Sequence, residues 1–371
     1  MKIVIKRDML FDGLQRVFSV VPQKPTLPVL TNFLLRATQE GLSISGTDMD
    51  LSVTTKLDCE IEGEGAVTVN AKRFLSIIRE LPEGDVTIRI EGERVTVDFA
   101  HGQSSIMGMS STDFPSIKEM IEGVTVELSG ADFFEMVDKT SFAVAIERTR
   151  VALTGVYWRI SSDNMVMVAT DGHRLSLMER RRDVKTDKVS EAIVPPKTLG
   201  QVSRIVSGGI DLERIIFSEG MVLFQFGGTT VFSKLIEGPY PDFRQVIPAQ
   251  NSKNVYVSTE ELAAAVRRVS VLSSTITHQV RFSLTPGQLE ISTSNVDIGG
   301  ESCENISVRY EGESLLAGFN AQFLLEILKK IESEEVLLEL ESPTSACILK
   351  PIVKEEKGEH IYLIMPLRLN E

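Results

Sequence analysis

The amino-acid sequence predicts an α+β protein made of three tandem copies of one unit, in which two helices pack on antiparallel strands. Three observations indicate this fold class: an internal repeat, two amphipathic helices in each copy, and hairpin-forming strands between and after them. A length of 371 residues also exceeds what one ordinary hydrophobic core supports. We therefore predict three domains, at residues 1–125, 126–250 and 251–371.

The repeat is clearest where a strand pair leads into a Thr-Asp dipeptide. Residues 30–48 align with residues 153–171 at a shift of 123, which places Thr47-Asp48 on Thr170-Asp171. A weaker third copy spans residues 280–295 and has Ser294-Asn295 at the same place. The alignment predicts that one structural unit occurs three times.

The first helix of each copy is predicted from apolar residues spaced by three and four, which give a helix one apolar face. These residues are Leu10, Leu14, Val17 and Val21; Phe133, Val137, Thr140 and Val144; and Leu262, Val266, Val269 and Leu272.

The second helices are predicted to begin at Asn70-Ala71, Pro195-Pro196 and Asn320-Ala321. Asn can cap a helix and Pro fits its first turn, so both residue types are suitable starts. The apolar faces that follow are Phe74, Ile77, Ile78 and Leu81; Leu199, Val202 and Ile205; and Phe323, Leu324, Ile327 and Leu328.

Alternating strands follow each second helix, with turns predicted at Glu91-Gly92, Glu219-Gly220 and Ser342-Pro343. The connections are too short for parallel crossovers, so we expect antiparallel hairpins.

The net charge of −13 argues against a nucleic-acid partner, unless the positive charges are gathered on one face. The predicted helices do carry basic residues, whereas many acidic residues fall in strands and turns. The basic residues are Lys6, Arg7, Arg16, Lys72, Arg73, Arg79, Lys139, Lys197, Arg204, Arg267, Arg268, Lys329 and Lys330. A basic helical wall would contact phosphates without reading sequence. The alternative is that these side chains only cover solvent-exposed helix faces.

Tandem copies can close into a ring if the last copy of one chain pairs with the first copy of another. Two chains would supply twelve helices, which at about 9–10 Å spacing enclose a circle with roughly 36 Å between opposite axes. Subtracting one helix diameter of about 10 Å leaves roughly 26 Å, enough for a hydrated DNA duplex.

The three cysteines, Cys59, Cys303 and Cys347, are far apart, and we expect reduced thiols. Charged residues from Lys6 onward interrupt the first apolar run, so no signal peptide is predicted, and no segment resembles a membrane span.

Four motifs, in register with the repeat, resemble those of a known family. They are Ala169-Thr-Asp-Gly-His-Arg-Leu175, Thr26-Leu-Pro-Val-Leu30 after Lys24-Pro25, Tyr240-Pro-Asp-Phe243, and Tyr362-Leu-Ile-Met-Pro-Leu-Arg-Leu369. Together they are similar to the bacterial DNA sliding clamps, the beta or processivity subunits of the replicative DNA polymerase III holoenzyme. The resemblance covers the whole chain in order.

The resemblance implies a head-to-tail homodimer that forms a six-domain ring around double-stranded DNA without sequence specificity. It also implies docking of the replicative polymerase catalytic subunit, the clamp loader, repair polymerases and mismatch-repair proteins through short Gln- and Leu-containing peptides. The expected location is the cytoplasm, at the nucleoid during replication. No catalytic residue, metal or cofactor is implied.

The resemblance also assigns roles to individual residues. The implied peptide groove comprises Leu153, Thr170, Gly172, His173, Arg174, Leu175, Pro241, Val246, Leu363, Ile364, Met365, Pro366 and Leu367. The implied DNA contacts are Lys24, Arg73, Arg148, Arg150 and Lys197. The implied dimer interface comprises Lys72, Arg94, Ile106, Val271, Leu272, Glu301 and Glu304.

The sequence departs from the family pattern in a few places. The run His101–Ser105 lacks expected arginines, and Asp297–Glu301 is thinly acidic, so ion pairing at the dimer interface should be reduced. Gln245 stands where an arginine is common, and Asn370-Glu371 extends past the usual end.

An enzyme is the competing hypothesis, with Asp48, Asp50, Asp171 and His173 as a metal or acid–base site. The four histidines show no metal-binding spacing, and there is no Gly-x-x-x-x-Gly-Lys loop for phosphate. A turn formed by Thr-Asp explains the repeated pair more simply. Turnover lost on His173→Ala would favour the enzyme; a dimer without turnover would favour the clamp.

Overall fold

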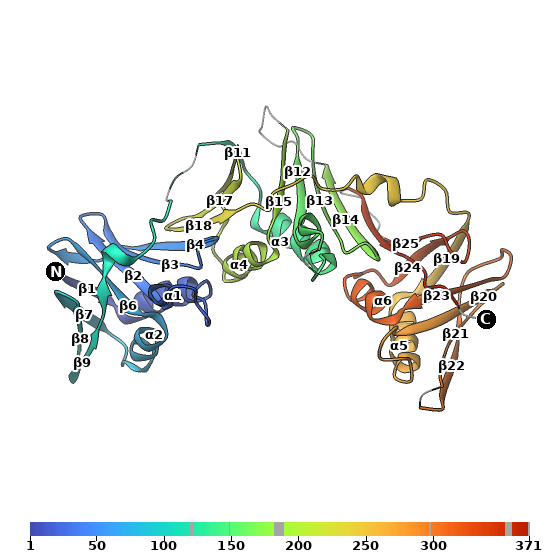
Figure 1. Ribbon diagram of the computed structural model, residues 1–371, viewed down its shortest axis with the longest axis horizontal. Helices are drawn as coiled ribbons and strands as arrows, with labels where there is room; N and C mark the ends of the chain where they lie inside the picture. The colour runs from blue at the N-terminus through green and yellow to red at the C-terminus, as the bar shows by residue number, and fades with distance from the viewer. Residues whose placement is uncertain are drawn as a thin grey trace. The chain divides into compact units, whose positions relative to one another are not determined.

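The structure is a computed structural model that describes residues 1–118, 120, 122–147, 149–181, 189–296, 298–352 and 358–369. Its elements repeat three times in the same order: a strand, a helix, three strands, another strand, a second helix and three further strands, with two additional short strands in the first copy (Figure 1). The mixed helix and antiparallel-sheet fold predicted from the sequence is confirmed.

The first copy comprises β1 (Lys2–Lys6), α1 (Arg7–Phe18), β2 (Asn32–Thr38), β3 (Gly41–Thr47), β4 (Leu51–Leu57), β5 (Glu60–Glu62), β6 (Gly65–Asn70), α2 (Ala71–Glu80), β7 (Asp85–Glu91), β8 (Arg94–Phe99), β9 (Gly102–Met107) and β10 (Met109–Ser110). The second comprises β11 (Val124–Val126), α3 (Gly130–Thr140), β12 (Val156–Ile160), β13 (Asn164–Thr170), β14 (Arg174–Arg181), β15 (Ser190–Val194), α4 (Pro196–Ser207), β16 (Arg214–Ser218), β17 (Met221–Phe226) and β18 (Thr229–Lys234). The third comprises β19 (Lys253–Ser258), α5 (Thr259–Ser270), β20 (Gln279–Thr285), β21 (Gln288–Asn295), β22 (Gly300–Ser307), β23 (Leu315–Asn320), α6 (Ala321–Leu328), β24 (Glu335–Leu340), β25 (Cys347–Pro351) and β26 (His360–Ile364).

Each copy divides its strands between two different sheets. Strands of the first copy continue into the second as one nine-stranded sheet, β10-β6-β2-β3-β4-β18-β17-β16-β11. Strands of the second copy continue into the third as an eight-stranded sheet, β15-β12-β13-β14-β26-β25-β24-β19. The remaining strands form a five-stranded sheet, β5-β1-β7-β8-β9, and a four-stranded sheet, β22-β21-β20-β23.

The chain accordingly forms two compact units, because the second copy is shared between sheets. One unit comprises Met1–Phe134 and Lys197–Leu235, and the other comprises Glu135–Pro196 and Ile236–Glu371. Each unit is described below by itself.

The predicted starts of the second helices are confirmed. The Asn70 side chain accepts a hydrogen bond from the Arg73 amide, and Asn320 accepts from the amides of Gln322 and Phe323. Pro196 is the first residue of α4, where its missing amide hydrogen is not needed.

The first helices are shorter than their apolar spacing predicted. Each ends before the last apolar residue of its pattern, so Val21, Val144 and Leu272 lie beyond the helix and are half-buried. The chain has already turned at these positions, through a 3-10 turn at 141–143 in the second copy. An apolar spacing therefore does not mark where a helix stops.

Helices cover only one face of the sheets, and connecting segments cover parts of the other. In the third copy α5 and α6 lie side by side and their apolar faces join Phe282, Phe319 and Tyr362 in one core (Figure 1). The opposite face of the eight-stranded sheet carries a second cluster, in which Phe243 and Tyr240 cover the sheet. Chain segments on these outer faces form the surfaces considered next.

The three predicted hairpin turns are confirmed between β7 and β8, β16 and β17, and β24 and β25. Cys59, Cys303 and Cys347 are all free thiols. Among the described residues, no helix is long and apolar enough to cross a membrane.

Candidate functional site

The Thr-Asp pair of the repeat forms the same turn in two copies. Asp171 Oδ1 accepts the amides of His173 and Arg174 at 2.8 and 2.9 Å, and Asp48 Oδ1 accepts those of Asp50 and Leu51 at 3.1 and 2.8 Å. The interpretation of this pair as a turn former is therefore confirmed, because its carboxylates are occupied by backbone amides.

The turn at residues 170–174 needs a glycine. Gly172 has φ +91°, a conformation that side chains rarely adopt, and an added Cβ would lie 2.8 Å from Arg150 Nη2. Thr170 closes the turn by donating its hydroxyl to the Arg174 carbonyl at 2.6 Å. The tight turn leaves His173 exposed at its tip.

Arg174 fastens this turn to two helical segments. Its side chain is buried, with Nε 3.1 Å from Asp171 Oδ2, Nη1 2.5 Å from Glu326 Oε2 and Nη2 3.1 Å from the Phe142 carbonyl oxygen. The guanidinium also lies over the Phe323 ring, 4.5 Å from its centroid. Arg174 thus points inward and holds the turn in place; it does not present its charge to solvent.

The exposed part of the surface is built around His173. Its ring stacks on Phe323, with centroids 6.4 Å apart and planes at 24°, and its carbonyl accepts the Met365 amide at 2.8 Å. Met365 is 39% exposed, so an apolar side chain stands next to the His173 turn. Pro366 and Leu367 continue this edge and are half-buried.

An apolar floor extends from this edge across the outer face of the eight-stranded sheet. Leu175 and Leu363 are opposite each other on β14 and β26 and are buried in one cluster with Phe243. Pro241 and Val246 are exposed on the segment that covers this cluster, and Val246 is 54% exposed. Exposed apolar side chains above a buried apolar floor provide a surface suited to leucine-containing peptides.

Two tyrosines, Tyr157 on β12 and Tyr240 on the covering segment, pack against this apolar cluster. The rings of Tyr157 and Tyr240 stack with centroids 5.1 Å apart. Burial is the main cause that raises the pKa of Tyr157 to about 12, with a smaller contribution from Glu191, and burial also raises the pKa of Tyr240. Burial thus disfavours the charged phenolate form of both side chains.

One implied groove residue has its side chain on the other face of the sheet, and two supporting residues are missing from the prediction. Ile364 is 1% exposed and belongs to the core around α5 and α6, because neighbouring residues of a strand face opposite sides. Leu153 is also buried, in the 3-10 turn Val151–Thr154. Phe323 and Glu326, which support His173 and Arg174, were not identified, since the α6 pattern assigned Phe323 to the core.

The implied DNA contacts differ in how free their charges are. Lys24 and Arg73 are exposed, the latter in the first turn of α2. Lys197 Nζ forms an ion pair with Asp48, and Arg150 Nη2 donates to the Asp171 carbonyl oxygen at 3.2 Å. Arg148 lies outside the described residues.

Two of the basic residues predicted on the helices form ion pairs within the chain. Lys139 is 6% exposed, and its Nζ is 2.7 Å from the Lys330 carbonyl oxygen and 2.5 Å from Glu332 Oε1. Lys330 Nζ lies 2.5 Å from Asp138 Oδ1. Lys139 therefore fits neither a basic wall nor a solvent-exposed helix face, because its side chain joins α3 to the segment after α6.

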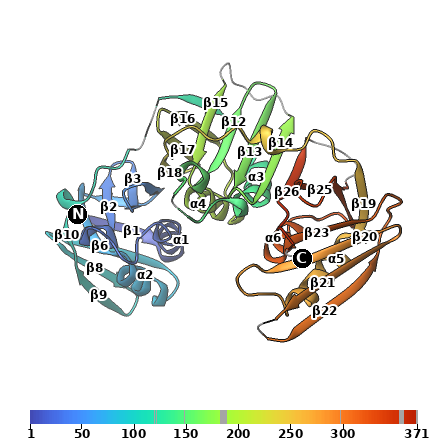
Figure 2. The ribbon, with the colours of Figure 1, turned by 45° about the vertical axis from the view of Figure 1, so that its right-hand side comes forward.

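Three of the implied dimer-interface residues, Ile106, Glu301 and Glu304, lie on the edge strands β9 and β22, one strand in each unit (Figure 2). Ile106 is half-buried on β9, the last strand of the five-stranded sheet, and Glu301 is exposed on β22, the last strand of the four-stranded sheet. Lys72 and Arg94 are exposed, as is Val271, whereas Leu272 is half-buried. Glu304 is paired with Arg268 of its own chain. Asp297 and the Asn370-Glu371 extension lie outside the described residues.

Comparison with known families matches nearly the whole chain. The N-terminal domain of the DNA polymerase III beta subunit matches residues 1–118, the central domain matches residues 127–242, and the C-terminal domain matches residues 244–368. The three tandem domains of the sequence prediction are thus shown, while the boundaries at 125 and 250 stay a prediction.

Individual relatives agree with this assignment. The chain is 31% identical to a beta sliding clamp of Chlamydia muridarum over 372 residues and 32% identical to one of Proteus mirabilis over 374 residues, with all of each chain covered. A sliding clamp structure from Pseudomonas aeruginosa superposes with a TM-score of 0.94 at 28% identity. A Bartonella birtlesii clamp, bound to griselimycin, superposes with 0.93 at 30% identity, again over the full length of both chains. The chain therefore belongs to the DNA polymerase III beta subunit family, the non-catalytic sliding clamps of bacterial replication.

Proposed function

We propose that two copies of this chain join head to tail into a closed ring that encircles duplex DNA and tethers polymerase to it. The observation that carries the proposal is that equivalent strands pair at both junctions between copies. At each junction between copies, the third strand after the first helix of one copy pairs with the third strand after the second helix of the next copy: β4 with β18, and β14 with β26.

The same rule leaves one strand of each kind unused among the described residues. β22 is the third strand after the first helix of the last copy, and β9 is the corresponding strand of the first copy. Pairing β22 with β9 of a second chain would extend the four-stranded sheet by the five-stranded one, giving nine strands, as in the sheet that joins the first and second copies. Repeating this contact twice closes a ring of six domains.

Apolar side chains near both free strands support the pairing. Met107 on β9 is 61% exposed, and Val271 and Ile298 beside β22 are 76% and 62% exposed. Burying such side chains against a partner releases them from water, and pairing the strands satisfies their free backbone groups. The Arg268–Glu304 pair within one chain supports the expectation that ion pairs between chains contribute little here.

Inside such a ring, exposed Lys24 and Arg73 would contact phosphates only. Lys197 and Arg150 would add to these contacts when they leave their present partners. A chain with a net charge of −13 would bind DNA weakly through so few cations, which suits a ring that slides. Retention then comes from topology and not from affinity.

We further propose that the surface around His173, Val246 and Met365 takes the short Gln- and Leu-containing peptides of polymerases, the loader and repair proteins. The apolar floor and the exposed rim support leucine binding, and His173 and the turn carbonyls offer polar contacts.

The proposed ring and the proposed peptide-binding surface can be tested separately. Sedimentation equilibrium should give about twice the chain mass of 41.0 kDa for the native protein and for His173→Ala. A fluorescent peptide containing Gln and Leu should bind native protein and bind His173→Ala at least several-fold more weakly. A monomeric native protein would contradict the ring, and unchanged peptide binding in His173→Ala and Met365→Ala would contradict the groove.

A further inference from the structure

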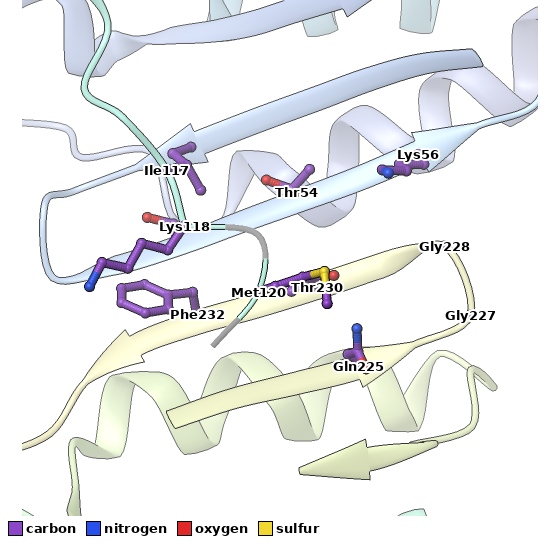
Figure 3. Close-up of a pocket in the computed structure, with 11 residues that line it drawn as sticks. Thr54, Lys56, Ile117, Lys118, Met120, Gln225, Gly227, Gly228, Thr230 and Phe232 are labelled. Carbon is purple, nitrogen blue, oxygen red and sulfur yellow. The ribbon is translucent and has the colours of Figure 1, made fainter. Parts of the chain in front are cut away.

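A hollow lies between helices α1 and α4, and neither the proposed ring contacts nor the groove uses it. α1 packs on Leu57 of β4, and α4 bonds to Ser233 of β18, so both helices cover the same face of the nine-stranded sheet. Figure 3 shows the opposite face, where Thr54 and Thr230 lie side by side on these two strands. The hollow encloses about 290 Å³ within one compact unit.

One buried side chain fixes the two helices beside this hollow. Gln201 of α4 is 4% exposed, and its Nε2 donates to the Arg16 carbonyl oxygen at 3.2 Å. Its Oε1 accepts a hydrogen bond from Ser19 Oγ at 2.5 Å. The end of α1 is thus bonded to α4, and the hollow is held open by a defined contact.

The lining of the hollow carries more positive than negative charge. Its exposed residues are Asp12, Gln15, Arg204 and Gly208. Arg16 and Ile210 are half-buried, and Ile205 is buried. Among the residues that the structure describes, neither Arg16 nor Arg204 forms an ion pair. Two unpaired guanidinium groups thus stand against the single carboxylate of Asp12, which favours an anion as the occupant.

The equivalent cation of the second junction, where β14 pairs with β26, is neutralised within the chain. The repeat shift of 123 places Arg16 on Lys139, and the spacing of 125 between second helices places Ser207 on Glu332. Lys139 Nζ lies 2.5 Å from Glu332 Oε1, whereas a serine cannot neutralise Arg16. The first junction, where β4 pairs with β18, therefore keeps a charge that the second does not.

One face of α4 continues from the hollow and carries three exposed residues in a row. Lys197, Gly200 and Arg204 are spaced by three and four, so they lie on one side of the helix. Gly200 is inside the helix, where glycine is less stable than other residues, and an added Cβ would meet no atom within 4 Å. Internal packing therefore does not require this glycine. A residue without a side chain does let another backbone approach the helix closely.

The spacing of the two cations on α4 fits a chain of phosphates. Lys197 and Arg204 are seven residues apart, which is about 10 Å along a helix. Three base steps of one DNA strand also rise about 10 Å. A row of cations with a glycine between them therefore matches a phosphate polymer better than one small anion.

We propose that this face of α4 and the hollow beside it form a track for the backbone phosphates of one DNA strand, with one phosphate held by Arg204 and Arg16. Guanidinium groups suit this role because their N–H groups donate to two phosphate oxygens at once. Gly200 lets the sugar–phosphate backbone lie against the helix. The inference rests on the proposed DNA partner and locates its contacts, which read no sequence because they reach phosphates only.

The test measures binding of a short fluorescent DNA duplex to the full-length protein by anisotropy at several salt concentrations. Arg16→Gln and Arg204→Gln should each weaken binding about threefold or more, and should make the slope of log affinity against log salt shallower by about one. Asp12→Asn should strengthen binding, because it removes the carboxylate beside the two arginines.

Gly200→Gln separates the track from a purely structural role of α4. Glutamine favours the helix and changes no charge, so this variant should unfold at a higher temperature than the native protein. Its side chain should nevertheless obstruct the track and weaken duplex binding about threefold or more. Unchanged duplex binding in Gly200→Gln would contradict the close approach of DNA to α4.

Arg214→Gln is the matched control, because Arg214 is an exposed arginine of the same unit that lies on β16 and bonds to Gln225. It should bind the duplex like the native protein. All variants should stay dimeric and stay on circular DNA at moderate salt, since closure and not affinity retains them there. Loss of retention in every protein, the native one included, would count against the ring and not against the track.

Three results would overturn the track. One is an equal loss of duplex binding in Arg214→Gln. Another is lower stability with unchanged duplex affinity in Arg16→Gln and Arg204→Gln, since both arginines lie in the last turn of a helix and would then only complement its dipole. The third is a rise in the unfolding temperature with inorganic phosphate that is lost in Arg204→Gln while duplex binding is not, which would assign the hollow to the free anion.

Discussion

At the scale of single residues, carboxylates set which positive charges are available. Asp48 and Asp171 use one oxygen to hold their turns and the other to hold a cation: Lys197 for Asp48, and Arg174 for Asp171. Asp48 is largely buried and fixed by two amides, so it is a stable partner for Lys197. The charge of a proposed DNA contact is therefore partly neutralised within the protein.

Replacing Asp48 with Asn should strengthen DNA binding. Asn keeps the oxygen that accepts the turn amides and removes the charge that holds Lys197. The slope of log affinity against log salt, measured with a short duplex, should steepen by about one. Asp50→Asn is the control. Asp50 lies in the same turn as Asp48, but it pairs with Lys234 and not with Lys197. An equal effect of both variants would show that only overall charge matters.

His360 should make the protein less stable in acid. Burial, followed by the nearby Lys139 and Arg180 charges, lowers the pKa of His360 to about 3. A histidine in the unfolded chain has a pKa of about 6.5, so below this pH it is protonated in the unfolded state while His360 in the folded protein stays neutral. Its contribution to stability is therefore present above pH 6.5 and is lost as the pH falls toward 3.

Urea unfolding of the native protein and His360→Gln checks this expectation. Between pH 6.5 and 4.5, the loss of unfolding free energy should be smaller in the variant by up to about 2 kcal/mol. His101→Gln, at an exposed position, should behave like the native protein. Identical pH dependence in all three proteins would contradict the assignment.

At the scale of elements, local signals were readable from the sequence and long-range ones were not. Asn70, Asn320 and Pro196 act on residues within one helical turn, so the helix starts could be predicted. Sheet partners such as β4 and β18 are joined by contacts between residues 51–55 and 229–233, which no local pattern encodes. The continuation of sheets from copy to copy therefore had to come from the structure.

In the candidate site, too, only the features set by local sequence or by the family resemblance could be predicted. The Thr170–Arg174 turn follows from its own sequence, and the family resemblance placed His173 and Met365 beside it. The resemblance assigned a run of residues, whereas neighbouring residues of a strand face opposite sides, so it could not show that the Ile364 side chain is buried in the core around α5 and α6. Phe323 was missed because a half-buried aromatic at helical spacing looks like a core residue.

Removing the N-terminal cap of α6 tests whether Asn320 fixes the start of this helix. Asn320→Ala should lower the unfolding free energy by about 1 kcal/mol, since two amides at the start of α6 lose their acceptor. The variant should also weaken groove-peptide binding, because α6 carries Phe323 and Glu326. Gln322→Ala, exposed on the same helix, should affect neither quantity. Equal stability of the two variants would rule out the capping role.

At the scale of the whole molecule, one pairing rule explains both the shared sheets and the two free edges. Leu272→Asp, beside β22, and Ile106→Asp, on β9, would place an unpaired charge in the proposed interface. Either variant should sediment near 41.0 kDa, half the mass expected for the native protein if it forms the proposed dimer, and should still bind groove peptide. Asp211→Asn is an exposed-residue control that should stay dimeric. Persistence of the dimer in both interface variants would place the interface elsewhere.

The central claim is that the protein holds DNA by enclosing it. The most direct measurement loads the protein on nicked circular DNA with its clamp loader and follows retention by gel filtration at moderate salt, before and after one cut linearises the circle. The ring predicts stable retention on the circle and rapid loss from the linear form, because the protein slides off the ends. Equal retention on both forms would mean that affinity, and not closure, holds the protein on DNA.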